Sequence, residues 1–464
     1  MSHDYQDRLD YLYGRLNYER VGMPTLASEL KLGRMRRLMR TLGEPGAGLS
    51  IIHVAGTKGK GSTAAMIAAS LSAAGISTGL FSSPHLHRIE ERFVLDGTPA
   101  TPDQIIELVD HVRAAERTLE LDPRGRTADG TTFFELTTAM GLVHFARHGA
   151  RAIVLEVGMG GRLDSTNVVR PALGVITNIS LDHTRQLGDN VASIAREKAG
   201  ILKRGRPAIA GARSREARRV IRQVAAQRSA PIREIDVDFH VESIPPTPPL
   251  FGPTPGDARV RTWRTDWGLI RLPLLGAHQA ENAAIALAAL DQLAEIEPEL
   301  EVGRDDVIRG FSRLKWPARV EIAGLEPTLV IDGAHNAASA LALAETLTLF
   351  FPPSRRILVF GTSREKDLDG QLRALLPLFD RVIVTRYLHN PRAQDPESVA
   401  ELVTAMGRRA EIVPDPAPAL ALARELAASS DLICVTGSLF LAAEIRAMVV
   451  PSAHPHSVVS QLGR

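Results

Sequence analysis

One short stretch, residues 51–75, constrains the fold of this chain more than any other. It reads IIHVAGTKGKGSTAAMIAASLSAAG: an apolar run, then a cluster of glycine and lysine, then an Ala-rich segment. The apolar run is typical of a buried strand, and the Ala-rich segment is typical of a helix. Glycines allow the backbone between them to turn tightly and to direct several N–H groups at an anion, to which the helix adds its positive N-terminal end. The stretch therefore predicts a strand–loop–helix unit that binds phosphate.

The spacing within this loop differs from the common phosphate-binding pattern G-x-x-x-x-G-K-[ST], because Gly61 separates Lys60 from Ser62. Lys60 supplies a full positive charge, and the Ser62 hydroxyl is a ligand suited to Mg²⁺. The alternative is a flexible glycine turn in front of a helix. Two classes of protein remain open from these residues alone: an ATP-driven enzyme and a nucleotide switch that regulates partners.

Strand-like and helix-like segments alternate along the rest of the chain. Apolar runs at residues 152–158 and 172–180 each adjoin a helix-like segment, and a second series of such runs begins near residue 317, with TLVIDGA, RRILVFG, DRVIVTR and DLICVTG. This alternation predicts an α/β fold with mainly parallel sheets. We expect a first domain over residues 1–303, a linker over 304–316 and a second domain over 317–464.

Three segments between these series break the alternation. The proline-rich residues 242–258 predict an exposed loop, residues 258–276 resemble an antiparallel edge, and residues 278–296 resemble a helix.

Composition excludes several classes of protein. The single cysteine, Cys434, rules out a disulfide framework within the chain and a cysteine-rich zinc site. The 55 basic and 53 acidic residues nearly balance, so nucleic acid and anionic membrane surfaces are not expected partners. The N-terminal segment lacks the apolar core of a signal peptide, and no run of about 18 apolar residues is present. We therefore expect a soluble, cytoplasmic protein.

A set of motifs in fixed order identifies a family resemblance. They are GTKGKGS (56–62), FSSPHL (81–86), LEVGMGGRLDSTN (155–167), SLDHT (180–184), AREKAGI (195–201), GAHQAENA (276–283), WPARVE (316–321), IDGAHN (331–336) and TGSLFLA (436–442). Together they resemble folylpolyglutamate synthase, including its bifunctional form with dihydrofolate synthase activity, in the Mur ligase superfamily. A looser form of a further signature, FGTSREKD, retains Lys366 and Asp367. The resemblance implies a central domain of Mur-ligase type that contains the phosphate loop and a mainly parallel sheet, followed by a smaller, Rossmann-like α/β domain.

The resemblance also implies an activity. The expected enzyme is an ATP-dependent amide ligase that adds L-glutamate to the carboxylate of folates through an acyl phosphate, and dihydropteroate is a second candidate acceptor. The alternatives are a Mur-type ligase with another carboxylate substrate and a non-catalytic, nucleotide-dependent regulator. An N-K-x-D run, which a GTPase switch would use to read guanine, is missing from the sequence. A monomer is expected.

Nucleotide-binding and catalytic residues are implied by the same motifs. The expected ATP ligands are Gly56, Thr57, Lys58, Gly59, Lys60, Gly61, Ser62, Asn282, Arg319 and Asp332. The expected catalytic residues are Lys60, Lys198 and His335. The structural alternatives are a helix cap for Asn282, a surface salt bridge for Arg319 and a turn former for Asp332.

Two Mg²⁺ sites are also implied by the resemblance. The expected ligands are Ser62, Ser83, Glu156, His183 and Lys198, with Lys198 carbamylated by CO₂. A carbamate is an anion, which two nearby cations would stabilise. The alternatives are a capped glycine turn for Glu156, a packed or solvated side chain for His183 and an exposed helical lysine for Lys198.

The acceptor site is expected around GTTFFELTTA (130–139) and the loop SSPHLHRIEERF (82–93). The expected substrate-binding residues are Pro84, Arg88, Phe133, Phe134, Glu135 and Ser438, and Arg92 is a further candidate for the substrate carboxylates. The alternatives are core packing for the aromatic rings, a solvated charged loop for the arginines and a glycine–serine turn for Ser438.

Overall fold

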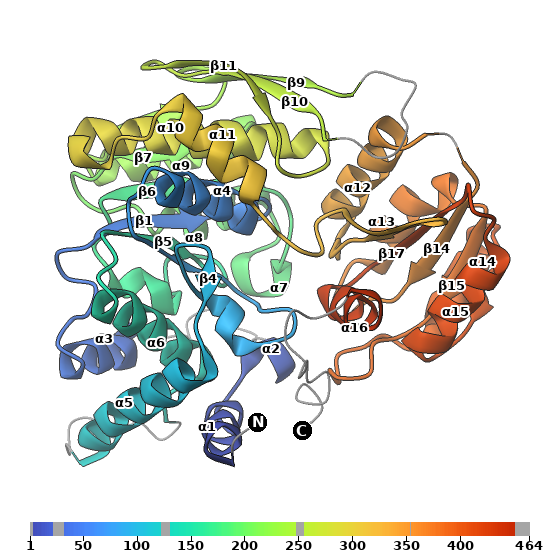
Figure 1. Cartoon of the computed structure of the whole chain (residues 1–464), viewed down its shortest axis with the longest axis horizontal. Coiled ribbons are helices and arrows are strands. Elements are labelled where there is room, and N and C mark those ends of the chain that lie inside the picture. Colours follow the sequence, from blue (N-terminus) through green and yellow to red (C-terminus); the bar gives the residue numbers. More distant parts are fainter. Residues whose placement is uncertain (1–2, 22–31, 122–129, 247–254, 353, 451–464) are drawn as a thin grey trace.

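The computed structural model describes residues 3–21, 32–121, 130–246, 255–352 and 354–450, and these form two lobes that lie side by side in Figure 1. The central lobe contains an eight-stranded sheet and a three-stranded sheet, and the second lobe contains a six-stranded sheet. The predicted α/β class is confirmed. None of the helices in the described ranges combines the length and the apolar character needed to cross a lipid bilayer.

The central sheet is parallel except at one edge. Its order is β4–β3–β2–β5–β1–β6–β7–β8, and only β3 and β4 run antiparallel to their neighbours. The strands are β1 (Ser50–Ala55), β2 (Thr78–Phe81), β3 (Phe93–Leu95), β4 (Thr98–Pro99), β5 (Ala152–Glu156), β6 (Leu173–Ile176), β7 (Ala208–Ala210) and β8 (Ile232–Glu234). Every residue of β1, β5 and β6 is buried, as expected for parallel strands covered on both faces.

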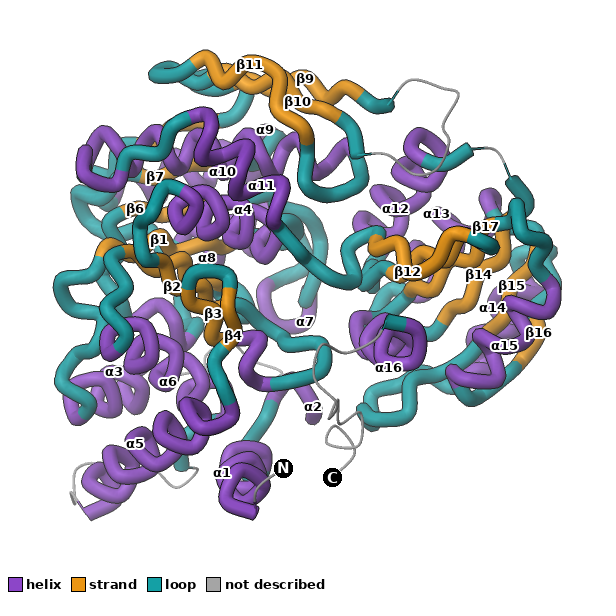
Figure 2. The backbone as a smooth tube through the Cα atoms, viewed as in Figure 1, coloured by secondary structure: helices purple, strands orange, loops and turns teal. Residues whose placement is uncertain are grey.

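Helices cover both faces of this sheet (Figure 2). Helices α4 (Lys60–Ala73), α10 (Ala277–Ile296) and α11 (Arg304–Arg313) share one hydrophobic cluster, and helices α1 (His3–Tyr13), α3 (Leu32–Thr41), α5 (Pro102–Leu121) and α6 (Phe133–Arg147) share another. Helices α8 (Val191–Ala199) and α9 (Arg215–Gln227) pack on β6 and β7. The short helices α2 (Tyr18–Val21) and α7 (Thr184–Leu187) lie in loops.

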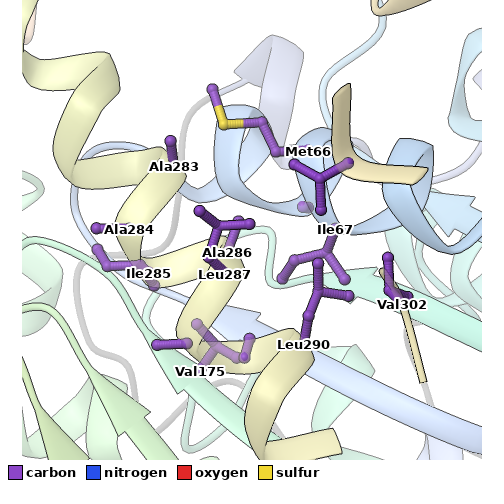
Figure 3. Close-up of a cluster of buried hydrophobic side chains, with 14 of the residues drawn as sticks. Met66, Ile67, Val175, Ala283, Ala284, Ile285, Ala286, Leu287, Leu290 and Val302 are labelled. Atoms are coloured by element: carbon purple, nitrogen blue, oxygen red, sulfur yellow. The ribbon is translucent and has the colours of Figure 1, made fainter. Parts of the chain in front are cut away.

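Small residues allow α4 and α10 to approach closely over the central strands. Figure 3 shows Ala283, Ala286 and Leu287 of α10 facing Met66 and Ile67 of α4. All five side chains are buried. This packing fixes the N-terminal end of α4, and with it the glycine loop, at the carboxyl end of β1.

The segment expected to be an antiparallel edge forms a separate sheet instead. Strands β10 (Asp257–Arg261) and β11 (Asp266–Arg271) pair antiparallel, as expected, but their third partner is β9 (His240–Ile244). Trp267 and Val260 of this sheet pack with α10, which explains why it covers a helix and does not extend the central sheet. The proline-rich segment begins inside β9, and its residues 247–254 lie outside the described ranges.

The second lobe is built on a sheet of order β12–β13–β17–β14–β15–β16, in which only β12 is antiparallel to its neighbour. The strands are β12 (Glu321–Leu325), β13 (Thr328–Ile331), β14 (Arg356–Phe360), β15 (Arg381–Val384), β16 (Glu411–Ile412) and β17 (Leu432–Thr436). The helices are α12 (Ala337–Phe350), α13 (Leu368–Leu375), α14 (Pro396–Ala405), α15 (Pro416–Leu426) and α16 (Leu439–Val449). The four strands predicted for this lobe from apolar runs are β13, β14, β15 and β17.

The expected linker, residues 304–316, is mostly helical. It contains α11, which packs along α4, and Gly310 of α11 lies so close that a side chain there would meet the Ala69 backbone. Val307 and Phe311 are buried in the same cluster as α4. The apolar residues of this segment therefore pack in the central lobe. Of the expected linker, only residues 314–316 remain as the connection between the lobes.

Candidate active site

The glycine loop joins β1 to α4 and lies where three strands end. Gly59 has a φ of 81°, in the left-handed region that favours glycine, and a side chain there would collide with Asn282 of α10. A Cβ atom at Gly61 would lie 3.0 Å from the Trp316 ring and 3.5 Å from the Glu156 carboxylate. The glycine inserted between Lys60 and Ser62 therefore lets the first turn of α4 pack directly against Glu156.

The backbone of this loop is held by the segment that follows β6. The Thr57 N–H donates to the Asn178 carbonyl at 2.7 Å, and the Thr57 hydroxyl donates to the Ser180 carbonyl at 3.1 Å. The Thr177 hydroxyl donates to the Lys58 carbonyl at 2.6 Å. These hydrogen bonds hold the backbone of the loop in place. The alternative of a flexible glycine turn therefore does not describe it.

Oxygen ligands of the kind that Mg²⁺ prefers gather beside the loop. Ser62 lies in the first turn of α4, Glu156 ends β5, and Ser83 follows β2, so the three come from neighbouring strand ends. The Ser62 and Glu156 side chains are buried, and the Ser83 N–H donates to the Glu156 carboxylate at 3.3 Å. Burial raises the pKa of Glu156, and Lys60 opposes that shift. In the described ranges no three His, Cys, Asp or Glu side chains are grouped as a metal site.

Lys198 is buried, contrary to the alternative of an exposed helical lysine. Its Nζ donates to the Gly56 carbonyl at 2.8 Å, which places it directly beneath the glycine loop. Burial, together with the nearby Lys60, lowers the pKa of Lys198 to about 7. A neutral amine, the form that reacts with CO₂, is therefore accessible near neutral pH.

Asp182 connects the glycine loop to the second lobe. Its carboxylate lies 3.4 Å from Lys58 Nζ, 3.1 Å from Lys366 Nζ and 2.9 Å from Asn336 Nδ2. Burial alone would raise the pKa of Asp182, but Lys58, His183 and Lys366 hold it well below its usual range. His183 follows immediately as the left-handed residue in front of α7, and burial lowers its pKa to about 3.

Asp332 and Arg319 lie where the second lobe meets the central lobe. The Asp332 carboxylate accepts hydrogen bonds from the Val320 N–H at 2.9 Å and from the Ala334 N–H at 2.7 Å, so it shapes the turn after β13. Burial raises its pKa, and Arg319 opposes the shift. Arg319 donates to the Ala318 carbonyl at 2.8 Å. The structure therefore shows Asp332 in the turn-forming role that was its alternative.

His335 and Ser438 lie at the ends of β13 and β17. His335 Nδ1 is 2.8 Å from the Gly333 carbonyl, which only accepts, so this nitrogen carries the proton, and Nε2 lies 3.9 Å from the Asp182 carboxylate. Burial and the charge of Lys366 lower the pKa of His335 well below its usual value. Ser438 caps α16 by accepting a hydrogen bond from the Phe440 N–H. Asn282 does not cap α10 but lies within it, buried against Gly59, and donates to Gln279 at 2.9 Å.

Two cavities meet at Ser83 and Pro84. The larger has a volume of about 1010 Å³ and is lined from both lobes, and the smaller has a volume of about 500 Å³. The larger contains these predicted site residues: Ser83, Pro84, Phe134, Glu135, His183, His335 and Ser438. The smaller contains Gly61, Ser83, Pro84, Glu156 and Arg319. The structure thus brings the phosphate loop, the acidic strand end and residues of the second lobe to one cleft.

The two adjacent phenylalanines have different surroundings. Phe134 lines the larger cavity, next to Gly158, whereas Phe133 is fully buried and stacks on Tyr13 with ring centroids 5.4 Å apart. Phe133 therefore matches the core-packing alternative, and the prediction that it contacts substrate is corrected. Glu135 completes a capping box with Thr132 and pairs with Arg34 at 2.7 Å.

The two arginines expected to meet substrate carboxylates already have partners. Arg88 pairs with the buried Glu90 at 2.7 Å, and neither cavity is lined by it. Arg92 is fully buried, pairs with Glu19 at 2.5 Å and donates to His85 at 2.7 Å. Both arginines therefore fix the loop after β2, and substrate binding by Arg88 stays a prediction.

Several residues of the site were not predicted. Asp164, in the third quoted motif, lines the larger cavity and accepts hydrogen bonds from the Met159 and Thr166 N–H groups at 2.9 and 3.0 Å. Burial raises its pKa. Asp182 lies inside the SLDHT motif beside His183, and its partner Lys366 lies in the retained KD pair. Asp164, Asp182 and Lys366 each lie in a quoted motif, and the motifs could have indicated them as site residues. The sequence does not show, however, that Asp182 and Lys366 are in contact.

Comparisons with known proteins agree with this arrangement. The Mur ligase middle domain model matches residues 54–290, and the Mur ligase glutamate ligase domain model matches residues 318–439. The chain is 31% identical to the dihydrofolate synthase/folylpolyglutamate synthase of Bacillus subtilis (strain 168), over 95% of this chain and 98% of that relative. It superposes on Mycobacterium tuberculosis folylpolyglutamate synthase complexed with ADP with a TM-score of 0.85 and 32% identity, covering 97% of this chain and 99% of the other.

A third relative is longer than this chain. The probable bifunctional folylpolyglutamate synthase/dihydropteroate synthase of Haloferax volcanii is 36% identical over 90% of this chain, but the match covers 49% of that relative. The chain therefore spans about half the length of this haloarchaeal protein.

Proposed function

The chain belongs to the Mur ligase family, in the branch of folylpolyglutamate and dihydrofolate synthases, and we propose that it uses ATP to join L-glutamate to the carboxylate of a folate or of dihydropteroate. One observation carries this proposal. Gly61 of the glycine loop and the buried Glu156 line the cavity of about 500 Å³, which joins the cavity of about 1010 Å³ at Ser83 and Pro84, and residues of both lobes line the two cavities.

The nucleotide would bind at the glycine loop. Residues 56–62 offer backbone N–H groups and the Lys60 ammonium to the phosphates. Asn282 is buried against the same loop, Arg319 lines the smaller cavity, and Asp332 is buried in the turn after β13, and these three are the proposed contacts to the rest of the nucleotide. Transfer of the γ-phosphoryl group would then depend mainly on positioning and on neutralisation of charge.

Magnesium fits the groups present beside the loop. Ser62, Ser83 and Glu156 would hold one ion, and His183 with a carbamylated Lys198 would hold a second. When bound, these ions would neutralise charge on the phosphates. The support from this chain is chemical: oxygen donors surround the first position, and the Lys198 amine, with a pKa of about 7, is poised to react with CO₂. The carbamate would form a new N–C bond and release one proton from the amine.

The acceptor would lie in the larger cavity with its carboxylate toward the glycine loop. Phe134 offers an aromatic face to the pterin or aminobenzoate ring. Attack of the carboxylate oxygen on the γ-phosphorus breaks the bond to the bridging oxygen and yields ADP and an acyl phosphate. The Lys60 ammonium would stabilise negative charge on the transferring group.

Glutamate would enter from the side of the second lobe. Its neutral amine attacks the acyl carbon, an amide forms, and inorganic phosphate leaves. His335 lines the larger cavity and its Nε2 is unprotonated, so His335 is the proposed acceptor of the proton that the amine loses. Ser438 lines the same cavity and would orient the glutamate. The docked second lobe would exclude water, which otherwise hydrolyses the acyl phosphate. Every group in this scheme comes from one chain, so a monomer suffices.

The acceptor can be identified directly. The protein is supplied with ATP, Mg²⁺ and L-glutamate, and with either dihydropteroate or tetrahydrofolate, and the products are analysed by mass spectrometry. We expect a mass increase of one glutamyl residue on at least one acceptor, with equimolar ADP. Absence of a new amide with both acceptors would contradict the proposal.

A further inference from the structure

The larger cavity is rich in charge, and nearly all of its basic side chains are already paired. Six acidic residues line it, Glu19, Glu135, Asp164, Asp182, Glu365 and Asp367, against four basic ones, Arg34, Arg185, Lys366 and Arg392. A substrate with more than one carboxylate would therefore enter an unfavourable field unless an unpaired cation received it.

Three of the four basic side chains are bound to the chain itself. Arg34 pairs with Glu135 at 2.7 Å, Lys366 pairs with Asp182 at 3.1 Å, and Arg392 pairs with Glu365 and donates to the Glu19 carbonyl at 3.0 Å. Arg185 is exposed, and it makes no ion pair or hydrogen bond through its side chain with the described part of the chain. It is the cation in this lining that is free to bind a ligand.

Arg185 also lies beside a residue of the proposed metal site. It lies on α7, two residues after His183, and α7 is held in place because Leu187 is buried against Gly160. The Leu187 and Gly188 N–H groups donate back to the His183 and Thr184 carbonyls, which closes the turn. Arg185 therefore lines the cavity from a fixed turn of the central lobe, on the segment that also carries His183.

The two candidate acceptors differ in the number of carboxylates near the reacting group. In a folate the terminal glutamyl residue has two carboxylates: the γ-carboxylate reacts, and the α-carboxylate remains charged beside it. Dihydropteroate has one carboxylate, which is the reacting group. A planar guanidinium binds a carboxylate through two parallel N–H···O bonds.

We propose that Arg185 is a specificity-determining residue that binds the α-carboxylate of the terminal glutamyl residue of a folate acceptor. This inference rests on the proposed function, since it names the part of the acceptor that the cavity recognises. Arg185 thereby favours acceptors that already contain glutamate over the pteroyl acid.

The test compares the wild type with Arg185→Gln on two acceptors: tetrahydrofolate and its analogue in which the terminal α-carboxylate is a carboxamide. The wild type should show a KM about tenfold higher for the carboxamide, because a charge-assisted hydrogen bond is lost. In Arg185→Gln the KM for tetrahydrofolate should rise about tenfold, and the two acceptors should become nearly equal. Arg185→Lys should restore part of the difference, and kcat should change little.

Arg219→Gln is the matched control, because Arg219 is exposed on α9 and neither cavity is lined by it. Unchanged discrimination in Arg185→Gln would overturn the inference while leaving the proposed function intact. An increase confined to the KM for glutamate or for ATP would also overturn it, because Arg185 would then serve another substrate. If the wild type forms no amide with any acceptor, the proposed function itself fails.

Discussion

The two lobes contribute to the cleft in different ways. In the central lobe the site is assembled from strand ends and the first turn of a helix, and the side chains of Ser62, Glu156 and Lys198 are buried there. In the second lobe Asp332 and Ser438 are likewise buried, but the His335 side chain is 38% exposed. The lobes meet through Asp182, which holds Lys366 and Asn336 from the second lobe.

This difference indicates a division of labour. In the proposed mechanism the central lobe holds the groups for phosphoryl transfer in a fixed arrangement, which reduces the cost of reorganisation during the reaction. The second lobe supplies the groups proposed to act after the lobes dock, such as His335 as proton acceptor. Changes in the central lobe should therefore reduce the chemical step most, and changes at the contact between the lobes should reduce it less.

The largest effect should come from Lys198→Ala. Loss of the buried amine removes the proposed carbamate ligand, so kcat should fall by about 10³-fold or more, of the order found when a preorganised electrostatic group is removed. ATP binding, measured by calorimetry, should change little. Arg196→Ala, an exposed residue on the same helix, is the control and should retain activity. Near-normal turnover by Lys198→Ala would contradict the proposed role of the central lobe, because phosphoryl transfer would not then depend on this amine.

Gly61→Ala should have the next largest effect. The added methyl group would lie 3.0 Å from the Trp316 ring and 3.5 Å from Glu156, so the first turn of α4, which carries the proposed metal ligand Ser62, must move away from Glu156. We expect kcat/KM to fall by about 10- to 100-fold, because small displacements of catalytic groups are costly. Gly33→Ala is the control: its Cβ atom would meet only the Arg37 side chain, at 3.9 Å. Wild-type kinetics for Gly61→Ala would show that the close approach to Glu156 is unnecessary.

Asp182→Asn tests the contact between the lobes. The substitution removes the charge that pairs with Lys58 and Lys366, so the lobes should dock less firmly and kcat/KM should fall by about tenfold. Small-angle X-ray scattering should show a larger radius of gyration than that of the wild type. Asp189→Asn, at an exposed position nearby, should change neither quantity. A loss as large as that of Lys198→Ala would assign Asp182 to the chemical step and remove the distinction between the lobes.

A smaller effect concerns the dependence of stability on pH. In CO₂-free buffer with EDTA, Lys198 has a pKa of about 7 in the folded protein and 10.5 in the unfolded chain. Between these values the unfolded chain binds more protons, so the contribution of Lys198 to the free energy of unfolding rises with pH. Urea unfolding at several pH values should show a steeper rise for the wild type than for Lys198→Met. Equal slopes would mean that Lys198 is not buried as a titrating amine.

The sequence predicted the central lobe better than the contacts across the cleft. The strand–loop–helix unit, the parallel strands and the position of Glu156 at a strand end follow from local periodicity and from glycine. The Asp182 contacts do not, because Lys58, Asn336 and Lys366 are 124, 154 and 184 residues away along the chain. Only the packing of the two lobes brings these residues together.

Two other failures have local causes. Phe133 and Phe134 occupy adjacent positions on one helix, and a rotation of about 100° per residue sends one ring into the core and the other toward the cavity. Spacing alone did not identify which ring would be buried. The expected linker contains Val307 and Phe311, four residues apart on one face of a helix, and this apolar face explains its packing on α4.

The central claim is that a carboxylate is activated on the central lobe and is then captured by glutamate with the second lobe docked. The most direct test measures ADP release and amide formation together, with the acceptor and L-glutamate supplied alone and in combination. We predict one ADP for each new amide when all substrates are present, and negligible steady-state ADP release when the acceptor is omitted. Rapid ADP release without an acceptor, or amide formation without ADP, would contradict the account.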